Sequence, residues 1–279
     1  MRFKPVSSKE LSHFWTLQLA MMTAHSDSVS AIAPALAALT PSQIDWVAAV
    51  IRQFHLPHEF SRKEDSDIVT PAVLDMFGDA LRIHHAFSRQ ALSKDRFEFA
   101  LERSLNRAGI QAELIENRTN RGHDITIKGI PVSLKTQADA SIRAELLHIS
   151  KFMELGKGPW ELSLLRNLFL QHMRSYERIF QFRCLLPGPT LHIYELVEIP
   201  KALLLESADA QLAVQTRSRQ APQPGYGNVF DADGKLKFAL YFDGGTERKL
   251  QIKKIRKDLC TVHAIWRFES APFEQSIPR

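Results

Sequence analysis

The spacing of the hydrophobic residues predicts two neighbouring helices in the first half of the chain. Apolar side chains recur at helical intervals from about Pro71 to Phe87 and from about Lys94 to Ala108, as on the buried face of an amphipathic helix. Ser93 is the expected N-cap of the second helix, and Gly109 is its expected stop. His84 and His85 are expected on a helix surface, because no acid or cysteine accompanies them at metal-ligand spacing.

From Ile110 the hydrophobic period shortens to two, which indicates short strands. The alternation is clearest from Leu236 to Asp243 and in the final run of Cys260, Val262, Ala264, Trp266 and Phe268. Helical spacing returns between Glu161 and Phe182, which predicts a third helix. This order of elements predicts an α/β or α+β fold, with a central mixed β-sheet flanked by helices. The pattern leaves parallel and antiparallel pairings open.

Residues 1–40 form a stretch rich in alanine and serine that we expect to be a separate helical extension. It ends at Thr40-Pro41, where Thr40 is the expected N-cap and Pro41 the first residue of the next helix. The remaining residues, 41–279, are expected to form the main domain. Polar residues interrupt the apolar N-terminal stretch before it reaches membrane-spanning length, so neither a signal peptide nor a transmembrane helix is predicted.

The segment with the clearest chemical content is a predicted hairpin between His123 and Gln137. Lys128-Gly129 is a plausible two-residue turn, and counting outward from it sets Asp124 opposite Ser133. Because side chains alternate across a strand, Asp124 shares a polar face with Ser133, Lys135 and Gln137, while the intervening aliphatic residues form the core face. We therefore expect one carboxylate and one ammonium to lie diagonally across the hairpin, within about 8 Å of each other.

This pairing has the geometry that phosphodiester hydrolysis requires. Asp124 offers a hard oxygen ligand for Mg²⁺, which lowers the pKa of a bound water. Lys135 would orient that water or stabilise negative charge in the transition state. The alternative is that both side chains are ordinary solvated charges on an exposed hairpin.

One carboxylate rarely holds Mg²⁺ alone, and the helix at 94–108 supplies a second. On a helical wheel, Glu98 lies at the edge of the buried face and is better placed than Glu102 to reach the adjoining sheet. Glu113 and Glu116 are further candidates. The order of helical Glu98, strand Asp124 and strand Lys135 strengthens the functional interpretation, although a single helical glutamate is usually a surface residue.

These residues resemble the PD-(D/E)xK nuclease superfamily, in which a helix precedes one strand bearing Asp and a second bearing (D/E)-x-K. Longer blocks resemble the SmaI family of type II restriction endonucleases over roughly residues 40 to 270. The blocks are RTNRGHDITI at 118–127, LKT at 134–136, MELGKG at 153–158, LVEIPK at 196–201, PGYG at 224–227 and YFDGGTERKLQIK at 241–253.

The resemblance implies a restriction-endonuclease-like core within 41–279, whose strand-rich C-terminal part reads DNA. It also implies a homodimer that needs Mg²⁺ and cuts both strands of double-stranded DNA within a short palindrome, CCCGGG for the SmaI type. In such a restriction-modification system, a DNA methyltransferase is the functional partner.

The resemblance carries Asp124, Lys135 and Glu98 over as the catalytic set. The sequence departs from the superfamily at Ser133, where an acid is expected. Either Glu98 replaces that acid as a metal ligand, or metal binding is weak. The backbone carbonyl of Leu134 could add a ligand, and Gln137 is expected to support Lys135.

Charge is consistent with a polyanionic partner. Lysine and arginine number 36 against 31 acids, a formal net charge of +5, which favours nucleic acid without demonstrating it. The expected DNA-binding residues lie in a basic strand at 248–257 and a turn-rich loop before Pro222; they are Arg248, Lys249, Gln251, Lys253, Arg217 and Arg219. Either segment could instead be an ordinary solvated surface.

Two other functions stay open at this point. One is a structure-specific repair or recombination nuclease of the same fold. The other is a DNA-binding protein without catalysis, which Ser133 in place of an acid makes plausible. Only two cysteines occur, Cys184 and Cys260, and neither has metal-ligand spacing, so a zinc site is not expected and a reducing cytoplasm fits.

Overall fold

The computed structural model describes residues 29–115, 122–138, 142–185 and 190–271. The chain forms two compact units, residues 1–52 and 53–279, and the division expected near residue 40 stays a prediction. Helix α2 (Pro41–His55) begins at the expected proline. The Oγ1 of Thr40 accepts a hydrogen bond from the Gln43 amide, and the Gln43 side chain accepts one from the Thr40 amide. This reciprocal pair caps the helix.

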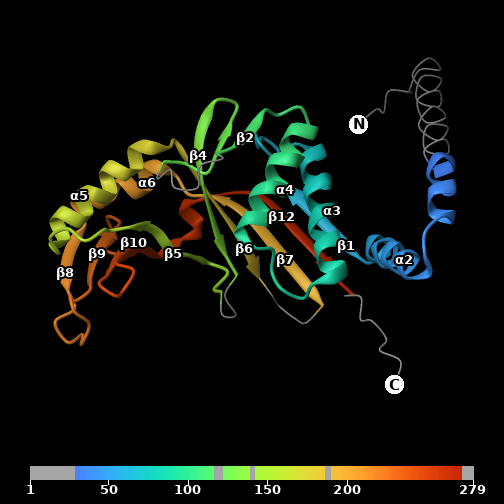
Figure 1. Ribbon diagram of the computed structural model, residues 1–279. Coiled ribbons are helices and arrows are strands. Elements are labelled where there is room, and N and C mark those ends of the chain that lie inside the picture. Colours follow the sequence, from blue (N-terminus) through green and yellow to red (C-terminus); the bar gives the residue numbers. More distant parts are fainter. Residues whose placement is uncertain (1–28, 116–121, 139–141, 186–189, 272–279) are drawn as a thin grey trace, which may run out of the picture. The chain divides into compact units, whose positions relative to one another are not determined.

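The second unit contains two β-sheets (Figure 1). The larger has seven strands, in the order β1 (His58–Arg62), β12 (Thr261–Glu269), β7 (Leu191–Glu198), β6 (Arg178–Leu185), β4 (Ile130–Gln137), β3 (Ile125–Ile127) and β2 (Ala112–Leu114). The smaller has five, in the order β5 (Leu146–Glu154), β11 (Lys249–Arg256), β10 (Leu236–Asp243), β9 (Gly225–Phe230) and β8 (Gln211–Val214). Strands β4 and β6 run parallel, and the other paired strands of the described residues run antiparallel.

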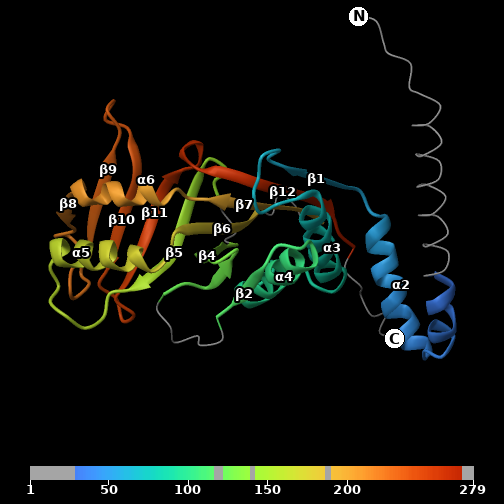
Figure 2. The ribbon, with the colours of Figure 1, turned by 90° about the horizontal axis from the view of Figure 1, so that it is seen from above.

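Helices α3 (Pro71–Phe87) and α4 (Lys94–Arg107) lie against the larger sheet, as Figure 2 shows from above. Both match the expected helices, which confirms a mixed sheet flanked by helices. The contact between them and the sheet is aromatic. Phe97 of α4 stacks on Phe182 of β6 with ring centroids 4.4 Å apart, and Phe77 of α3 packs edge-on against both rings. Burying three phenylalanines here fixes both helices on the sheet that contains the predicted hairpin, at the strand next to β4.

A second hydrophobic core lies under the smaller sheet. Helix α5 (Leu162–His172) contributes Leu165 and Phe169, and α6 (Lys201–Leu205) contributes Leu203 and Leu204. The short 3₁₀ helix η1 (Met173–Ser175) follows α5, η2 (Glu206–Asp209) follows α6, and η3 (Lys257–Leu259) lies between β11 and β12. Within the described residues, no helix combines the length and apolar character needed to cross a membrane.

Two local expectations were wrong. The helix predicted over 161–182 ends at His172 and η1, and the chain then enters strand β6. This strand is buried on both faces, with Ile179 in one hydrophobic core and Phe180 in the other. Strands buried on both faces lose the alternation that distinguishes them from helices. His85 is also not a surface residue, because its fully buried ring stacks on that of His192, with centroids 3.8 Å apart.

Candidate active site

The hairpin folds as the sequence predicts. Lys128 and Gly129 form its turn with positive φ angles of 50° and 76°, the conformation that two-residue hairpin turns require. Ile127 pairs with Ile130, and beyond β3 the Asp124 amide donates to the Val132 carbonyl at 3.0 Å. Asp124 therefore lies beside the stretch of β4 that carries Ser133 and Lys135.

The two carboxylate oxygens of Asp124 have different partners. Its Oδ2 accepts a hydrogen bond from the Leu134 amide at 2.6 Å and one from the Ser133 hydroxyl at 3.2 Å. Its Oδ1 accepts one from the Lys94 ammonium at 2.8 Å. Burial opposes ionisation, but the cations of Lys135 and Lys94 and these hydrogen bonds outweigh it and lower the pKa of Asp124. The carboxylate is thus fixed in place and ionised.

Lys135 lies on the face of β4 that also carries Ser133, and its side chain projects toward Asp124. Its Nζ lies 3.9 Å from Asp124 Oδ2 and 5.4 Å from the centre of the Phe152 ring. Burial lowers the pKa of Lys135, and the carboxylate of Asp124 partly offsets that effect. A largely buried ammonium held in this way is suited to meet a phosphate group that enters the pocket.

Glu98 joins this group through Lys94, which the sequence reasoning did not single out. Lys94 Nζ lies 3.1 Å from Glu98 Oε1 and also bonds Asp124, so one ammonium bridges both acids. Oε1 of Glu98 is buried and accepts no well-directed hydrogen bond in the described structure. Burial raises the pKa of Glu98, and the charge of Lys94 offsets part of the rise.

Glu102, one turn later on α4, has a structural role. Its Oε1 accepts a hydrogen bond from the Leu114 amide at 2.8 Å, which ties the helix to β2. Glu113 lies in β2 and is exposed, whereas Glu116 falls outside the described residues. Of Glu98 and Glu102, Glu98 is therefore the one that shares a cation with Asp124, as the helical wheel favoured.

The other residues proposed around Lys135 have distinct placements. The side chain of Ser133 is buried, and its hydroxyl is used as a donor to Asp124. The amide of Leu134 donates to the same carboxylate. Because the carbonyl of a residue in an extended strand projects to the same side as its amide, the Leu134 carbonyl lies on the Asp124 side of β4. Gln137 accepts hydrogen bonds from the His148 amide and the Gln181 side chain, so it is directed toward β5 and β6.

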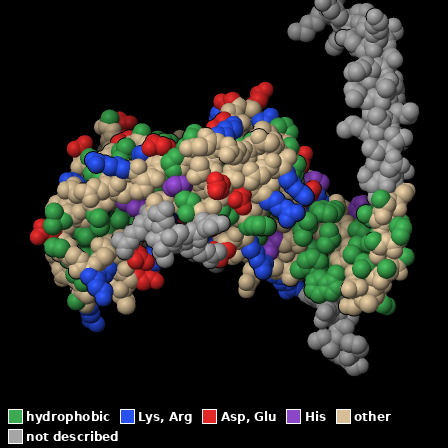
Figure 3. Space-filling model, turned by 45° about the horizontal axis from the view of Figure 1, so that its top comes forward, with side chains coloured by type: hydrophobic (Ala, Val, Ile, Leu, Met, Phe, Trp, Pro, Cys, Tyr) green, Lys and Arg blue, Asp and Glu red, His purple; other side chains and the backbone are tan. Residues whose placement is uncertain are grey.

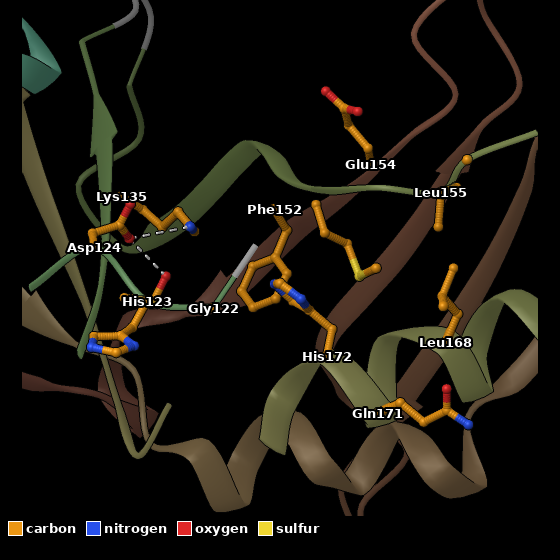
Figure 4. Close-up of a pocket in the computed structure, with 13 residues that line it drawn as sticks. Gly122, His123, Asp124, Lys135, Phe152, Glu154, Leu155, Leu168, Gln171 and His172 are labelled. Atoms are coloured by element: carbon orange, nitrogen blue, oxygen red, sulfur yellow. Dashed lines mark hydrogen bonds and ion pairs between the residues drawn. The ribbon is translucent and has the colours of Figure 1, made fainter. Parts of the chain in front are cut away.

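Asp124 and Lys135 line a pocket of about 660 Å³. Figure 4 shows them facing each other at one end, with Phe152 and His172 across the cavity. The walls come from the start of the hairpin, β4, the end of β5 and helix α5; further lining residues are Gly122, His123, Ser133, Met153, Glu154, Leu155, Gly156, Leu168 and Gln171.

The sequence reasoning missed His123, Glu154 and His172 as pocket residues. The only sequence signal for the first two was their place inside the blocks that resemble the SmaI family. His172 comes from α5, and nothing in its local sequence relates it to the hairpin. At one end of the pocket, an acid and a largely buried ammonium meet.

Of the side chains that the structure describes near Asp124, few could bind a metal ion. Within the described ranges, no group of three or more His, Cys, Asp or Glu side chains is arranged to hold a metal ion. Asp124, Glu98 and the Leu134 carbonyl instead provide two carboxylates and one backbone oxygen. Such a set fits Mg²⁺, which is usually held by one or two carboxylates and completes its octahedron with water and substrate phosphate.

The basic strand predicted to bind DNA has the expected orientation. Leu250 and Ile252 of β11 are fully buried, so Lys249, Gln251 and Lys253 face the other way, as the alternation predicts. Each outward side chain has a partner. The side chain of Gln251 donates to Asp243 at 3.0 Å, Lys249 pairs with Glu247 at 3.1 Å, and Lys253 Nζ lies 3.4 Å from the centre of the Tyr241 ring.

The three arginines predicted to bind DNA differ in how far the rest of the protein holds their side chains. The guanidinium of Arg248 lies 4.7 Å from the centre of the Trp160 ring and donates to the Gly158 carbonyl at 3.0 Å. Arg217 and Arg219 are exposed in the loop between β8 and β9. Figure 3 shows basic side chains at the outer end of the smaller sheet.

Comparison with known proteins identifies the family. A family model described as SmaI, type II site-specific deoxyribonuclease, matches residues 32–268. The type II restriction enzyme SmaI of Serratia marcescens is 50% identical over 211 residues, which are 76% of this chain and 85% of that protein. No solved structure matches. These matches set aside the repair nuclease and the DNA-binding protein without catalysis. The chain belongs to the SmaI family of type II site-specific deoxyribonucleases.

Proposed function

We propose that the chain is a Mg²⁺-dependent restriction endonuclease that hydrolyses double-stranded DNA at the end of the pocket where Asp124 meets Lys135. The observation that carries this proposal is the 3.9 Å approach of Lys135 Nζ to Asp124 Oδ2 within that cavity. A carboxylate and an ammonium placed together this way serve metal binding and charge stabilisation at one phosphate.

Asp124 and Glu98 would hold the metal, with the Leu134 carbonyl as a third oxygen. The Lys94 ammonium supports this assignment, because it lies 2.8 Å from Asp124 Oδ1 and 3.1 Å from Glu98 Oε1 and so marks a position where one cation can meet both carboxylates. When bound, Mg²⁺ supplies Lewis-acid activation of the phosphate and of water. The hydroxyl of Ser133 has a different task here, since it orients the Asp124 carboxylate instead of acting as a ligand.

Lys135 would act on the phosphate directly. Its largely buried ammonium would stabilise the negative charge that builds on the phosphate oxygens as the bond to the leaving oxygen breaks. Phe152 packs near the ammonium and helps to exclude water from that position. Gln137 would contribute indirectly, by bonding β5 through the His148 amide and so fixing the strand that carries Lys135.

The substrate would be a short palindrome in double-stranded DNA. By analogy with the relative that is named a type II restriction enzyme, the SmaI-type sequence CCCGGG is the first site to test. A palindrome is read by a symmetric pair of subunits, so we infer a homodimer. A cognate DNA methyltransferase in the same cytoplasm would protect the host's sites.

DNA would contact the outward face of β11 and the loop between β8 and β9, within the nuclease domain at 41–279. Exposed Arg217 and Arg219 would meet the phosphates. Gln251 and Arg248 have amide and guanidinium donors of the kind that read base edges. Lys249 and Lys253 would add positive charge along the backbone.

A digest tests this function. Unmethylated plasmid DNA with a single CCCGGG site should be cut once with Mg²⁺ and left intact with a chelator. Lys135→Ala should lower the cleavage rate by about 10²-fold or more, while binding to the same DNA stays within a few-fold. Lys128→Ala, in the turn of the same hairpin, is the matched control and should cleave normally. Normal cleavage by Lys135→Ala would contradict the assigned centre.

A further inference from the structure

Lys94 has no role in the function proposed above, although its ammonium touches both acids of the site. Its Nζ lies 2.8 Å from Asp124 Oδ1 and 3.1 Å from Glu98 Oε1. Asp124 and Glu98 come from different elements, a hairpin and a helix. Lys94 is thus the cation that joins them in the described structure.

The oxygens that Lys94 contacts are those that would face a metal. Asp124 Oδ2 is occupied by the Leu134 amide and the Ser133 hydroxyl, so Oδ1 is the oxygen left for an added cation. Glu98 Oε1 is buried and lies 3.1 Å from the same ammonium. An ammonium and a divalent ion cannot share these two oxygens at bonding distance, because their positive charges repel.

The position of Lys94 in its helix is unfavourable apart from these contacts. It is the first residue of α4, where the helix dipole disfavours a positive charge. A lysine that precedes a glutamate by four residues is also the less favourable order for a helical ion pair. The side chain is 43% exposed, and its long stem allows the ammonium to turn out into water.

We propose that Lys94 is an internal counter-cation, which neutralises Asp124 and Glu98 in the metal-free enzyme and turns out to solvent when a divalent cation binds. The inference rests on the proposed function, since it requires these two acids to be the metal ligands. Its consequence is that Lys94 weakens divalent-cation binding in the absence of DNA.

Metal binding to the DNA-free protein tests this directly. Mn²⁺ suits the same hard oxygen ligands as Mg²⁺, and the free ion can be counted by electron paramagnetic resonance. Lys94→Met should bind Mn²⁺ about tenfold more tightly than the unmodified protein, because a competing positive charge is removed. Added Mn²⁺ should also raise the melting temperature of Lys94→Met by more than it raises that of the unmodified protein. Arg96→Met removes a charge from the same helical turn without touching either acid, and should bind Mn²⁺ as the unmodified protein does.

The possible outcomes distinguish the role of Lys94 from the proposed metal site on which it depends. If the unmodified protein binds Mn²⁺ and Asp124→Asn abolishes that binding, the metal site stands; Lys94→Met with equal or weaker affinity would then overturn the role of Lys94 alone. If neither the unmodified protein nor Lys94→Met binds Mn²⁺ while circular dichroism shows both to be folded, both proposals fail. Lys94→Arg, which keeps the charge, should retain the weak affinity of the unmodified protein.

Discussion

The ring of Phe97 lies flat on the ring of Phe182, with centroids 4.4 Å apart and planes inclined by 3°. Phe97 precedes Glu98 in α4, and Phe182 lies in β6 beside the strand that carries Lys135. The stack therefore fixes the rotation of α4 about its axis. That rotation decides that Glu98 and Lys94, which lie one turn apart in α4, are on the side of the helix where Lys94 reaches Asp124.

Phe97→Ala should destabilise the protein by about 3–5 kcal/mol, because a fully buried ring is lost and the cavity cannot close completely. Chemical denaturation measures the change in the free energy of unfolding. Phe99→Ala is the control in the same helix, since that side chain is 57% exposed. Equal losses for the two variants would mean that the Phe97 stack does not hold the helix.

Glu98→Gln and Glu102→Gln should separate the two acids of α4. Glu98→Gln removes a proposed metal ligand, so cleavage should fall by at least about 10²-fold and more Mg²⁺ should be needed. Glu102→Gln keeps a side-chain oxygen that can accept from the Leu114 amide, so its cleavage should be nearly unchanged. Initial rates across a Mg²⁺ titration measure both, and the reverse result would assign the metal to Glu102.

Stability should fall as the pH drops below about 6.5, because two buried histidines must stay neutral. Burial, followed by repulsion from the neighbouring histidines, lowers the pKa of His85 to about 3. For His192, burial and then His84 lower it to about 4. Both values are below the 6.5 of an unperturbed histidine, so the unfolded chain takes up protons first. This stability is complete above the unfolded pKa and is lost as the pH falls toward the folded ones.

Denaturation at a series of pH values measures this effect. Between about pH 6.5 and pH 5 the loss should be on the order of 2 kcal/mol for each histidine. His192→Gln should make the dependence shallower, because one titrating group is gone. A flat profile for the unmodified protein would show that the histidine pair does not govern it.

Arg217→Ala and Arg219→Ala should each weaken DNA binding at low salt. If both arginines contact phosphates, each loss should reduce the slope of log affinity against log salt by about 1. Fluorescence anisotropy with a labelled duplex, in the presence of a chelator, measures affinity without cleavage. Arg103→Ala, an exposed arginine of α4, should leave the slope unchanged; a slope unaffected in all three variants would exclude this loop from the phosphate contacts.

The sequence could predict the hairpin and the placement of Asp124 and Lys135, the two residues proposed to act there, because these depend on local rules. The turn at Lys128-Gly129 fixes the register, and the two-residue period then puts Asp124 and Lys135 on one face. The helical wheel likewise chose Glu98 over Glu102. Local rules failed where burial is decided by distant parts of the chain. Phe180 belongs to a strand buried on both faces, and His85 is covered by a histidine more than a hundred residues away in the sequence.

What the sequence by itself determined was the family, the hairpin and the identity of its acid and its amine. Only the tertiary structure decided that Lys94 joins Glu98 to Asp124, and that α5 closes the pocket with His172. The physical reason is the range of the interactions. Turn geometry and alternation act between near neighbours, whereas the approach of α4 and α5 to the hairpin results from the packing of two separate hydrophobic cores.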